Sequence, residues 1–130
     1  MASADPRRKP PLILVVDDEP IIRMIMLETL EDAGFDVLVA RDAHEALRVF
    51  ERQDEVALVL TDIDMPGGLN GLELRAELLS RAPHVPVLVI SGGGGASNRS
   101  PGARFLAKPF NSRDLVAAVV ACLKPDDDPA

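Results

Sequence analysis

The chain has 130 residues, of which 47% are hydrophobic and 27% are charged, and this is the size and composition of one globular domain. Its net charge of −7 argues against non-specific binding to nucleic acid, which needs a basic surface. Cys122 is the single cysteine, so an internal disulfide is excluded, and no apolar run approaches the ~20 residues that span a bilayer. We therefore expect a cytoplasmic protein with no nucleic-acid or membrane partner.

Apolar, strand-like runs alternate with helix-like patterns along the chain, which predicts βαβ units and a parallel sheet. Residues 12–16 form the first expected strand. A helix should follow, with Pro20 near its first position and Gly34 at its C-cap. Within this helix the 3.6-residue period predicts one buried stripe made of Ile22, Ile25, Met26, Thr29, Leu30 and Ala33.

The later elements follow the same alternation. Asp42 with Glu45, and Asn70 with Glu73, have the spacing of capping boxes at the starts of two helices. We expect the other strands at about residues 36–40, 56–61, 86–90 and 105–107, and the other helices at about 43–53, 71–82 and 112–123.

The segment between the last two strands, residues 91–102, breaks the pattern. It contains four consecutive glycines, which are poor helix formers, so we expect a loop with at most one helical turn. At the ends, residues 1–10 should form a flexible tail and residues 125–130 an acidic tail. The domain proper is then 11–124, and a second domain is not expected.

Polar residues that could bind a ligand or take part in catalysis follow four of the expected strands. Asp17 and Asp18 follow the first strand, Asp62 the third, Ser91 the fourth and Lys108 the fifth. Sites in open parallel sheets form beyond the carboxyl ends of the strands, so these side chains are predicted to meet. Carboxylates that meet repel each other unless a cation lies among them, and oxygen ligands favour Mg²⁺. The alternative is a set of solvated loop acids that never meet.

The chemistry that fits this set is phosphoryl transfer onto a carboxylate. An aspartate can act as a covalent nucleophile and form an aspartyl-phosphate. A metal ion offsets the repulsion between two anions, while a lysine and a hydroxyl hold the phosphoryl oxygens. Taken singly, Lys108 could be a surface lysine and Ser91 a turn residue; as a set, they favour a site.

Five stretches that are spread along residues 11–124 carry a family resemblance: residues 12–20, 61–66, 70–74, 87–92 and 105–110. In this order they resemble a response-regulator receiver domain of bacterial two-component signalling. The resemblance implies a flavodoxin-like (βα)5 fold, a doubly wound parallel sheet with strand order 2-1-3-4-5. The short glycine-rich segment implies that the family's fourth helix is reduced or replaced by a loop.

The resemblance also implies roles around a metal ion. Asp62 would be the phosphoacceptor. Asp18 would bind Mg²⁺ directly, and Asp17 would bind it through water. Asp64 would offer its backbone carbonyl to the same ion.

Other residues would hold the phosphoryl group and transmit the signal. By the same resemblance, Ser91 and Lys108 would bind the phosphoryl oxygens, and the bond before Pro109 would be a cis peptide. Ser91 and Phe105 would be switch residues, although Phe105 could equally be plain core. Such a protein would catalyse only its own phosphorylation and dephosphorylation, and so would not be an enzyme in the usual sense.

Two apolar surfaces indicate protein partners. A histidine kinase or histidine phosphotransfer protein would dock near Ile21, Met24 and Leu27. The last helix is apolar from Leu115 to Leu123, which fits either a homodimer surface or an ordinary buried face diluted by alanine. The downstream target would be another protein.

Three alternatives remain. Asp62-Ile63-Asp64 also resembles the nucleophile motif of haloacid-dehalogenase-type phosphohydrolases, but that family places the motif on its first strand. A flavodoxin-type ligand binder would need a phosphate loop after the first strand, where this chain has three acids. A receiver-like interaction module could also signal without phosphate.

Overall fold

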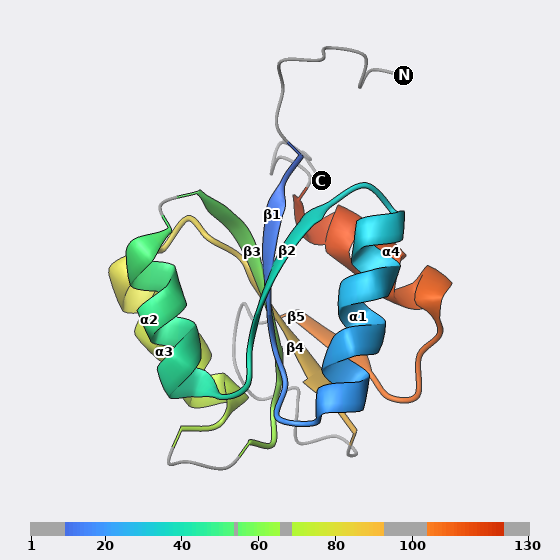
Figure 1. Cartoon of the computed structure of the whole chain (residues 1–130). Helices are drawn as coiled ribbons and strands as arrows, with labels where there is room; N and C mark the ends of the chain where they lie inside the picture. The colour runs from blue at the N-terminus through green and yellow to red at the C-terminus, as the bar shows by residue number, and fades with distance from the viewer. Residues whose placement is uncertain (1–9, 54, 66–68, 93–103, 124–130) are drawn as a thin grey trace, which may run out of the picture.

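The computed structural model describes residues 10–53, 55–65, 69–92 and 104–123 (Figure 1). Its five strands are parallel and form one sheet in the order β2-β1-β3-β4-β5, as the sequence predicted. In chain order the elements are β1 (Leu12–Val16), α1 (Pro20–Asp32), β2 (Asp36–Ala40), α2 (Ala43–Arg52), β3 (Val56–Asp62), α3 (Gly71–Arg81), β4 (Val87–Ser91), β5 (Arg104–Ala107) and α4 (Ser112–Leu123).

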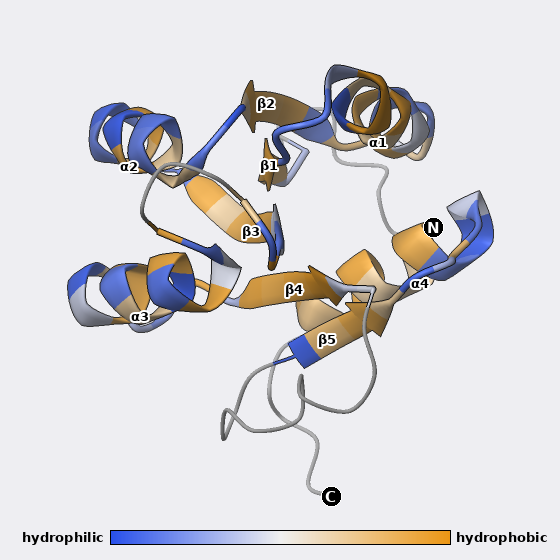
Figure 2. Cartoon of the chain, turned by 90° about the horizontal axis from the view of Figure 1, so that it is seen from below, coloured by the Kyte–Doolittle hydropathy of each residue, from blue (hydrophilic) through white to orange (hydrophobic). Residues whose placement is uncertain are grey.

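Helices cover both faces of the sheet, with α1 and α4 on one side and α2 and α3 on the other (Figure 1). The inner strands β1, β3 and β4 are therefore mostly apolar. In β1, Ile13 and Val15 pack toward α1 and α4, and Leu14 and Val16 toward α2 and α3. Figure 2 shows this mainly hydrophobic sheet beside the more hydrophilic helices α2 and α3. Two aliphatic cores on opposite faces hold the strand ends at a common edge.

Local hydrogen bonds fix where the helices begin. At α3 the capping box is complete: Asn70 Oδ1 accepts from Glu73 N, and Glu73 Oε1 accepts from Asn70 N, both at 2.9 Å. At α2, Asp42 Oδ1 accepts from Glu45 N at 2.8 Å, but Glu45 Oε1 accepts from Arg41 N, so the expected box is only half formed. The two helix starts are otherwise where the sequence placed them.

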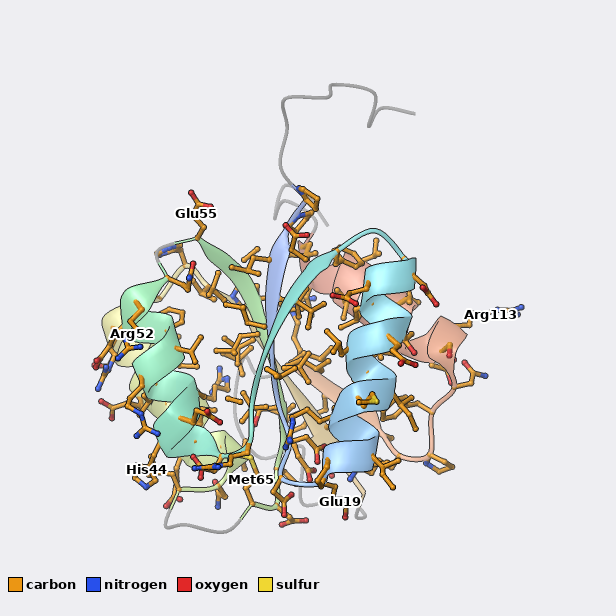
Figure 3. The ribbon with its side chains drawn as sticks, viewed as in Figure 1. Glu19, His44, Arg52, Glu55, Met65 and Arg113 are labelled. Atoms are coloured by element: carbon orange, nitrogen blue, oxygen red, sulfur yellow. The ribbon has the colours of Figure 1, made fainter. Side chains whose placement is uncertain are left out.

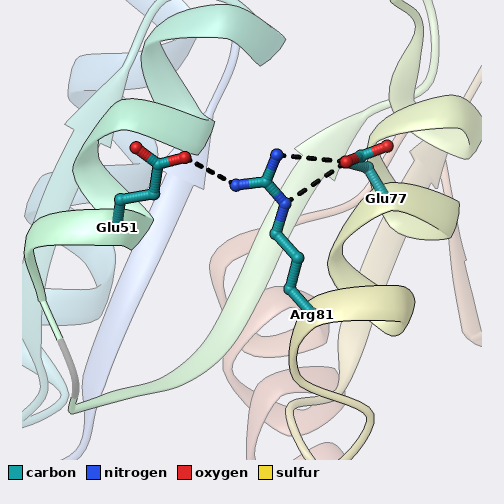
Figure 4. A network of polar contacts seen from close by, with 3 residues as sticks. All are labelled: Glu51, Glu77 and Arg81. Atoms are coloured by element: carbon teal, nitrogen blue, oxygen red, sulfur yellow. Dashed lines mark hydrogen bonds and ion pairs between the residues drawn. The ribbon is translucent and has the colours of Figure 1, made fainter.

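An exposed ion-pair network joins α2 to α3 (Figure 4). Arg81 Nη1 lies 2.7 Å from Glu51 Oε2, and Arg81 Nη2 lies 3.1 Å from Glu77 Oε2. Solvent-exposed pairs of this kind contribute little to stability.

The predicted stripe on α1 is partly wrong. Met26 and Leu30 are buried and Ile22 and Thr29 are half-buried, but Ala33 is exposed and Ile25 is 52% exposed. Successive helix residues are rotated by about 100°, so the residue before Met26 lies beyond the edge of a narrow buried face. The periodicity located the face but overestimated its width.

Some expectations fall outside the described residues. The loop expected between β4 and β5, and with it the reduced fourth helix, lies mostly in residues 93–103. Residues 1–9 of the expected N-terminal tail and the whole expected acidic tail, residues 125–130, also lie outside the described residues. Within the described part of the chain, no helix combines the length and apolarity needed to cross a membrane.

Candidate functional site

Three acids converge at the carboxyl edge of the sheet. Val16 of β1 pairs with Thr61 of β3, so the residues that follow them, Asp17 and Asp62, arrive side by side. One carboxylate oxygen from each of Asp17, Asp18 and Asp62 lies within 4.8 Å of those of the other two. Figure 3 shows the adjoining Glu19 and Met65 at this lower edge of the molecule. The fold therefore brings the predicted acids together.

Asp17 is a buried carboxylate with one oxygen left over. The residue is 1% exposed, its Oδ1 accepts from Glu19 N at 2.9 Å, and its Oδ2 has no hydrogen-bond partner among the described residues. Burial raises the pKa of Asp17; the charges of Asp62 and Asp18 raise it further, while the Glu19 N–H and Lys108 lower it. A buried carboxylate without a full set of partners is costly.

Asp62 is the last residue of β3 and is 6% exposed. Its Oδ1 lies 3.4 Å from Lys108 Nζ. Burial raises the pKa of Asp62, while the charge and hydrogen bond of Lys108 and the backbone of Asp64 and Ile63 lower it. Asp62 thus has a cationic partner at 3.4 Å.

Ser91 and Lys108 reach the site from the next two strands. Ser91 ends β4, is 6% exposed, and pairs with Ala107 of β5. Lys108 N donates to Ser91 O at 2.9 Å, which fixes the end of β5 beside β4. The Lys108–Pro109 peptide bond is cis.

The two remaining predicted residues lie around this core. Asp64 is exposed in the loop after β3. Phe105 is half-buried on β5 and packs against the core on the α2–α3 side. Its packing is compatible with both roles considered for it.

Two further residues of the site escaped the sequence analysis. Gly71, at the start of α3, lies so close to β3 that an added Cβ would collide with the main-chain oxygen of Asp62 and lie 2.8 Å from the Cα of Ile63. Arg23 donates from Nη1 to the main-chain oxygen of Asp17 at 2.8 Å. The one available signal for Gly71 was a glycine at the first position of a capped helix, where it weakens the helix.

The donor set fits a hard divalent cation. Three carboxylates from two strand ends converge, one of them has a buried oxygen without a partner, and a single lysine faces them. Oxygen ligands of this kind suit Mg²⁺, which uses one or two carboxylates and keeps several waters. A bound cation would also remove the repulsion that these carboxylates otherwise exert on one another.

An open parallel sheet with acids, a hydroxyl and a lysine at the carboxyl ends of its strands defines a doubly wound α/β protein with its site at that edge. The family model described as the response regulator receiver domain matches residues 13–120. The chain belongs to this family. It is therefore a receiver domain of the two-component response regulators, which are signalling modules that interact with histidine kinases and bind Mg²⁺ at an acidic pocket.

Individual relatives agree. The chain is 38% identical over 118 residues to the transcriptional regulatory protein CpxR of Klebsiella pneumoniae, a match covering 86% of this chain and 49% of CpxR. The chain thus spans about half the length of the curated relatives it matches. The expectation that it has no nucleic-acid partner stays a prediction.

Solved structures show the same fold. A response regulator receiver domain protein from Clostridium thermocellum superposes with a TM-score of 0.80 at 33% identity, covering 87% of this chain and 94% of that one. The response regulator TrrA from Thermotoga maritima, solved in complex with Mg²⁺-BeF, has a TM-score of 0.76 at 32% identity, with 87% and 99% covered. The family match rules against the haloacid-dehalogenase-type and flavodoxin-type alternatives.

Proposed function

We propose that this chain accepts a phosphoryl group on Asp62 from a histidine kinase or a histidine phosphotransfer protein, with Mg²⁺ as cofactor, and signals by protein–protein contacts. One observation carries the proposal: the carboxylates of Asp17, Asp18 and Asp62 lie within 4.8 Å of one another, with Lys108 Nζ 3.4 Å from Asp62 Oδ1. Phosphoryl transfer depends mainly on positioning and charge stabilisation, and this arrangement supplies both.

In the reaction, a carboxylate oxygen of Asp62 attacks the phosphorus atom. A phosphorus–oxygen bond forms as the bond from phosphorus to the donor's imidazole nitrogen breaks, and the imidazole keeps that electron pair. Lys108 then moves its ammonium from the carboxylate toward the phosphoryl oxygens, and the Ser91 hydroxyl donates to another of them. Both groups start at adjoining strand ends, where the Lys108 N–H is bonded to the Ser91 carbonyl oxygen.

The acids around Asp62 hold the metal ion. Asp18 would hold the ion directly, Asp17 through water and Asp64 through its backbone carbonyl, and Asp62 would be the remaining protein ligand. Bound there, Mg²⁺ supplies positive charge that neutralises the incoming phosphoryl group and the carboxylates. The unpartnered Oδ2 of Asp17 supports this assignment because a bound cation with its waters would supply the partner that this buried oxygen lacks.

Ser91 and Phe105 would then respond to the new charge on Asp62. Phosphorylation adds about −1.5 to −2 charges and three strong acceptor oxygens at Asp62. Ser91 moves toward them, and Phe105, half-buried on the adjacent strand, repacks behind it. The chain catalyses only its own phosphorylation and dephosphorylation.

The phosphodonor docks on α1, beside the acidic cluster. Ile21 and Met24 are 73% and 57% exposed, as this surface requires. Leu27, also expected there, is half-buried, and Ile25 is exposed instead. On α4, Val120 is 39% exposed, which leaves a small apolar surface for a homodimer.

The test is intact-mass spectrometry after incubation with phosphoramidate, with and without Mg²⁺. Wild type should gain one phosphoryl group only when Mg²⁺ is present. Asp62→Asn should gain none. The matched control is Asp64→Asn, which keeps its adduct because only the backbone carbonyl of residue 64 is used.

If no adduct forms in wild type, beryllofluoride binding is measured by calorimetry, since a short phosphate lifetime would hide the product. Beryllofluoride binding would then support the phosphoacceptor site. Absence of both would refute it and leave the phosphate-independent interaction module. An adduct that persists in Asp62→Asn would assign the phosphoryl group to another residue.

A further inference from the structure

Three hydrogen bonds hold Asp17 and leave one of its carboxylate oxygens without a partner among the described residues. Its N–H donates to Ala40 O of β2 at 3.1 Å, and its Oδ1 accepts from Glu19 N at 2.9 Å. Its main-chain oxygen accepts from Arg23 Nη1 at 2.8 Å. Only Oδ2 has no partner in the described structure. The orientation of this residue is therefore specified by its neighbours.

Arg23 reaches this position from α1. Its backbone N–H donates to Glu19 O at 2.9 Å, so it belongs to the first turn of the helix that follows the acids. Its side chain is half-buried and folds back onto the end of β1, whereas the next residue, Met24, is exposed. The guanidinium thus ties the start of α1 to the strand end that carries the acids.

The hydrogen bond from Arg23 does not occupy the carboxylate oxygens of Asp17. Arg23 bonds to the main chain of Asp17, and Lys108 is the cation whose ammonium pairs with a site carboxylate, that of Asp62. An arginine paired with the Asp17 carboxylate would compete with a metal ion for the same oxygens. Bonded to the carbonyl, it orients the residue without occupying its ligand atoms.

We propose that Arg23 is a positioning residue for the metal site. It holds the peptide after Asp17, and with it the turn through Asp18 and Glu19, so that the carboxylates of Asp17 and Asp18 face Asp62. The proposal rests on the proposed Mg²⁺ role of these acids. An arginine suits the task because its planar, multi-donor head reaches farther and bonds more directionally than a lysine ammonium.

The size of the effect follows from other metal sites. Groups that orient a metal's ligands typically contribute 10- to 100-fold to metal affinity. We expect Arg23→Met to weaken Mg²⁺ binding by about tenfold. Arg23→Lys, which keeps the charge and N–H donors but loses the planar guanidinium, should recover part of that loss.

The experiment is a calorimetric Mg²⁺ titration of the full chain, since no Trp or Tyr is present to report binding by fluorescence. Wild type, Arg23→Met and Arg23→Lys are compared with Arg113→Met as the matched control. Arg113 extends from α4 into solvent, away from the site (Figure 3). Its variant should bind Mg²⁺ like wild type.

A second readout needs no metal. In the Mg²⁺-free protein, amide exchange is measured at Glu19, whose N–H is bonded to Asp17 Oδ1, and at residues in the centre of β3. A positioning role predicts faster exchange at Glu19 in Arg23→Met with unchanged exchange in β3. Faster exchange at both would show a global loss of stability and would overturn the specific role.

The outcomes separate this inference from the function it rests on. Equal Mg²⁺ affinity in wild type and Arg23→Met would overturn the role of Arg23 and leave the metal site intact. No Mg²⁺ binding by wild type would overturn the metal site and this inference together. The positioning role of Arg23 would be established by three results together: weaker Mg²⁺ binding in Arg23→Met, partial recovery in Arg23→Lys and unchanged binding in Arg113→Met.

Discussion

Asp17 shows that single residues of the site are placed for binding at the expense of stability. It is nearly inaccessible, it has a carboxylate oxygen without a partner, and burial raises its pKa. Asp62 lies beside it, and burial raises its pKa although Lys108 and the backbone of Asp64 and Ile63 lower it. Functional sites commonly hold such unfavourable arrangements, and relieving them stabilises the protein while removing its activity.

Asp17→Asn should therefore stabilise the Mg²⁺-free protein by about 1 kcal/mol. The amide keeps an acceptor for the Glu19 N–H but removes a buried charge from the cluster. Urea denaturation with and without millimolar Mg²⁺ measures this, and the gain in stability that Mg²⁺ gives wild type should disappear. Asp36→Asn, at an exposed position where β2 begins, is the control. A variant less stable than wild type would contradict the argument.

Gly71→Ala should displace the proposed phosphoacceptor, Asp62, because residue 71 lies against its main chain. The added Cβ would collide with the main-chain oxygen of Asp62, so α3 or the end of β3 must shift, at a cost of about 1–3 kcal/mol. The yield of the phosphoramidate adduct should fall with it. In the control, Gly92→Ala, the Cβ meets only the flexible Lys108 side chain, at 3.4 Å. Equal stability losses in the two variants would refute the close-contact explanation.

At the scale of elements, α3 is placed by its N-terminal cap. The reciprocal bonds between Asn70 and Glu73 hold the helix start, and the next residue, Gly71, donates its N–H to Ile63 O at 2.9 Å. The cap therefore holds the start of α3 against the end of β3, which carries Asp62. A side chain outside the site thus helps to set its geometry.

Asn70→Ala should cost about 1 kcal/mol of unfolding free energy, measured by urea denaturation, because the Glu73 N–H loses its acceptor. Asn111→Ala removes the equivalent bond at α4, where Asn111 Oδ1 accepts from Asp114 N at 2.8 Å, and should cost a similar amount. Only Asn70→Ala should also lower the phosphoramidate adduct yield. Equal adduct yields in the two variants would show that the cap of α3 does not affect the site.

Helix α1 supplies a surface as well as a support. Met24→Lys places a charge within the exposed apolar surface of Ile21, Met24 and Ile25. The donor is the histidine kinase of the source organism that phosphorylates wild type fastest. Phosphoryl transfer from this kinase to the variant should be about tenfold slower, because an apolar contact is lost. Phosphorylation by phosphoramidate should not change. Unchanged transfer from the kinase would place its docking surface elsewhere.

For the whole molecule, we expect the two aliphatic cores, which share one sheet, to unfold as one cooperative unit, and Cys122 can test this. Its thiol lies in the core between the sheet and α4 at 8% exposure, and burial raises its pKa, opposed by Arg104. A raised pKa leaves little thiolate, which is the reactive form. The thiol should therefore react only when the structure opens.

Ellman's reagent at pH 8 should label the native chain far more slowly than the chain in urea. Mg²⁺ should slow native labelling further, because a ligand that binds only the folded state lowers the unfolded population. Asp62→Asn should weaken this Mg²⁺ effect. Fast native labelling would show that α4 opens independently of the rest.

Much of the fold followed from local patterns. The strand positions were predicted to within about one residue, since apolar runs closed by polar residues are visible without tertiary information. The predicted acids meet because the carboxyl ends of parallel strands share one edge. Ile25 was misplaced because helical period shows the direction of a buried face, while its width depends on how α1 sits on the sheet.

The sequence by itself determined the class of fold, the strand order implied by the family resemblance, and the acids, hydroxyl and lysine at one edge. These follow from periodicity and strand ends, which are properties of short segments. Only the tertiary structure decided that Arg23 holds the main chain of Asp17, and that Gly71 must lack a side chain beside Asp62. Such contacts depend on where a helix crosses a strand end, and that position is set by the packing of the whole core.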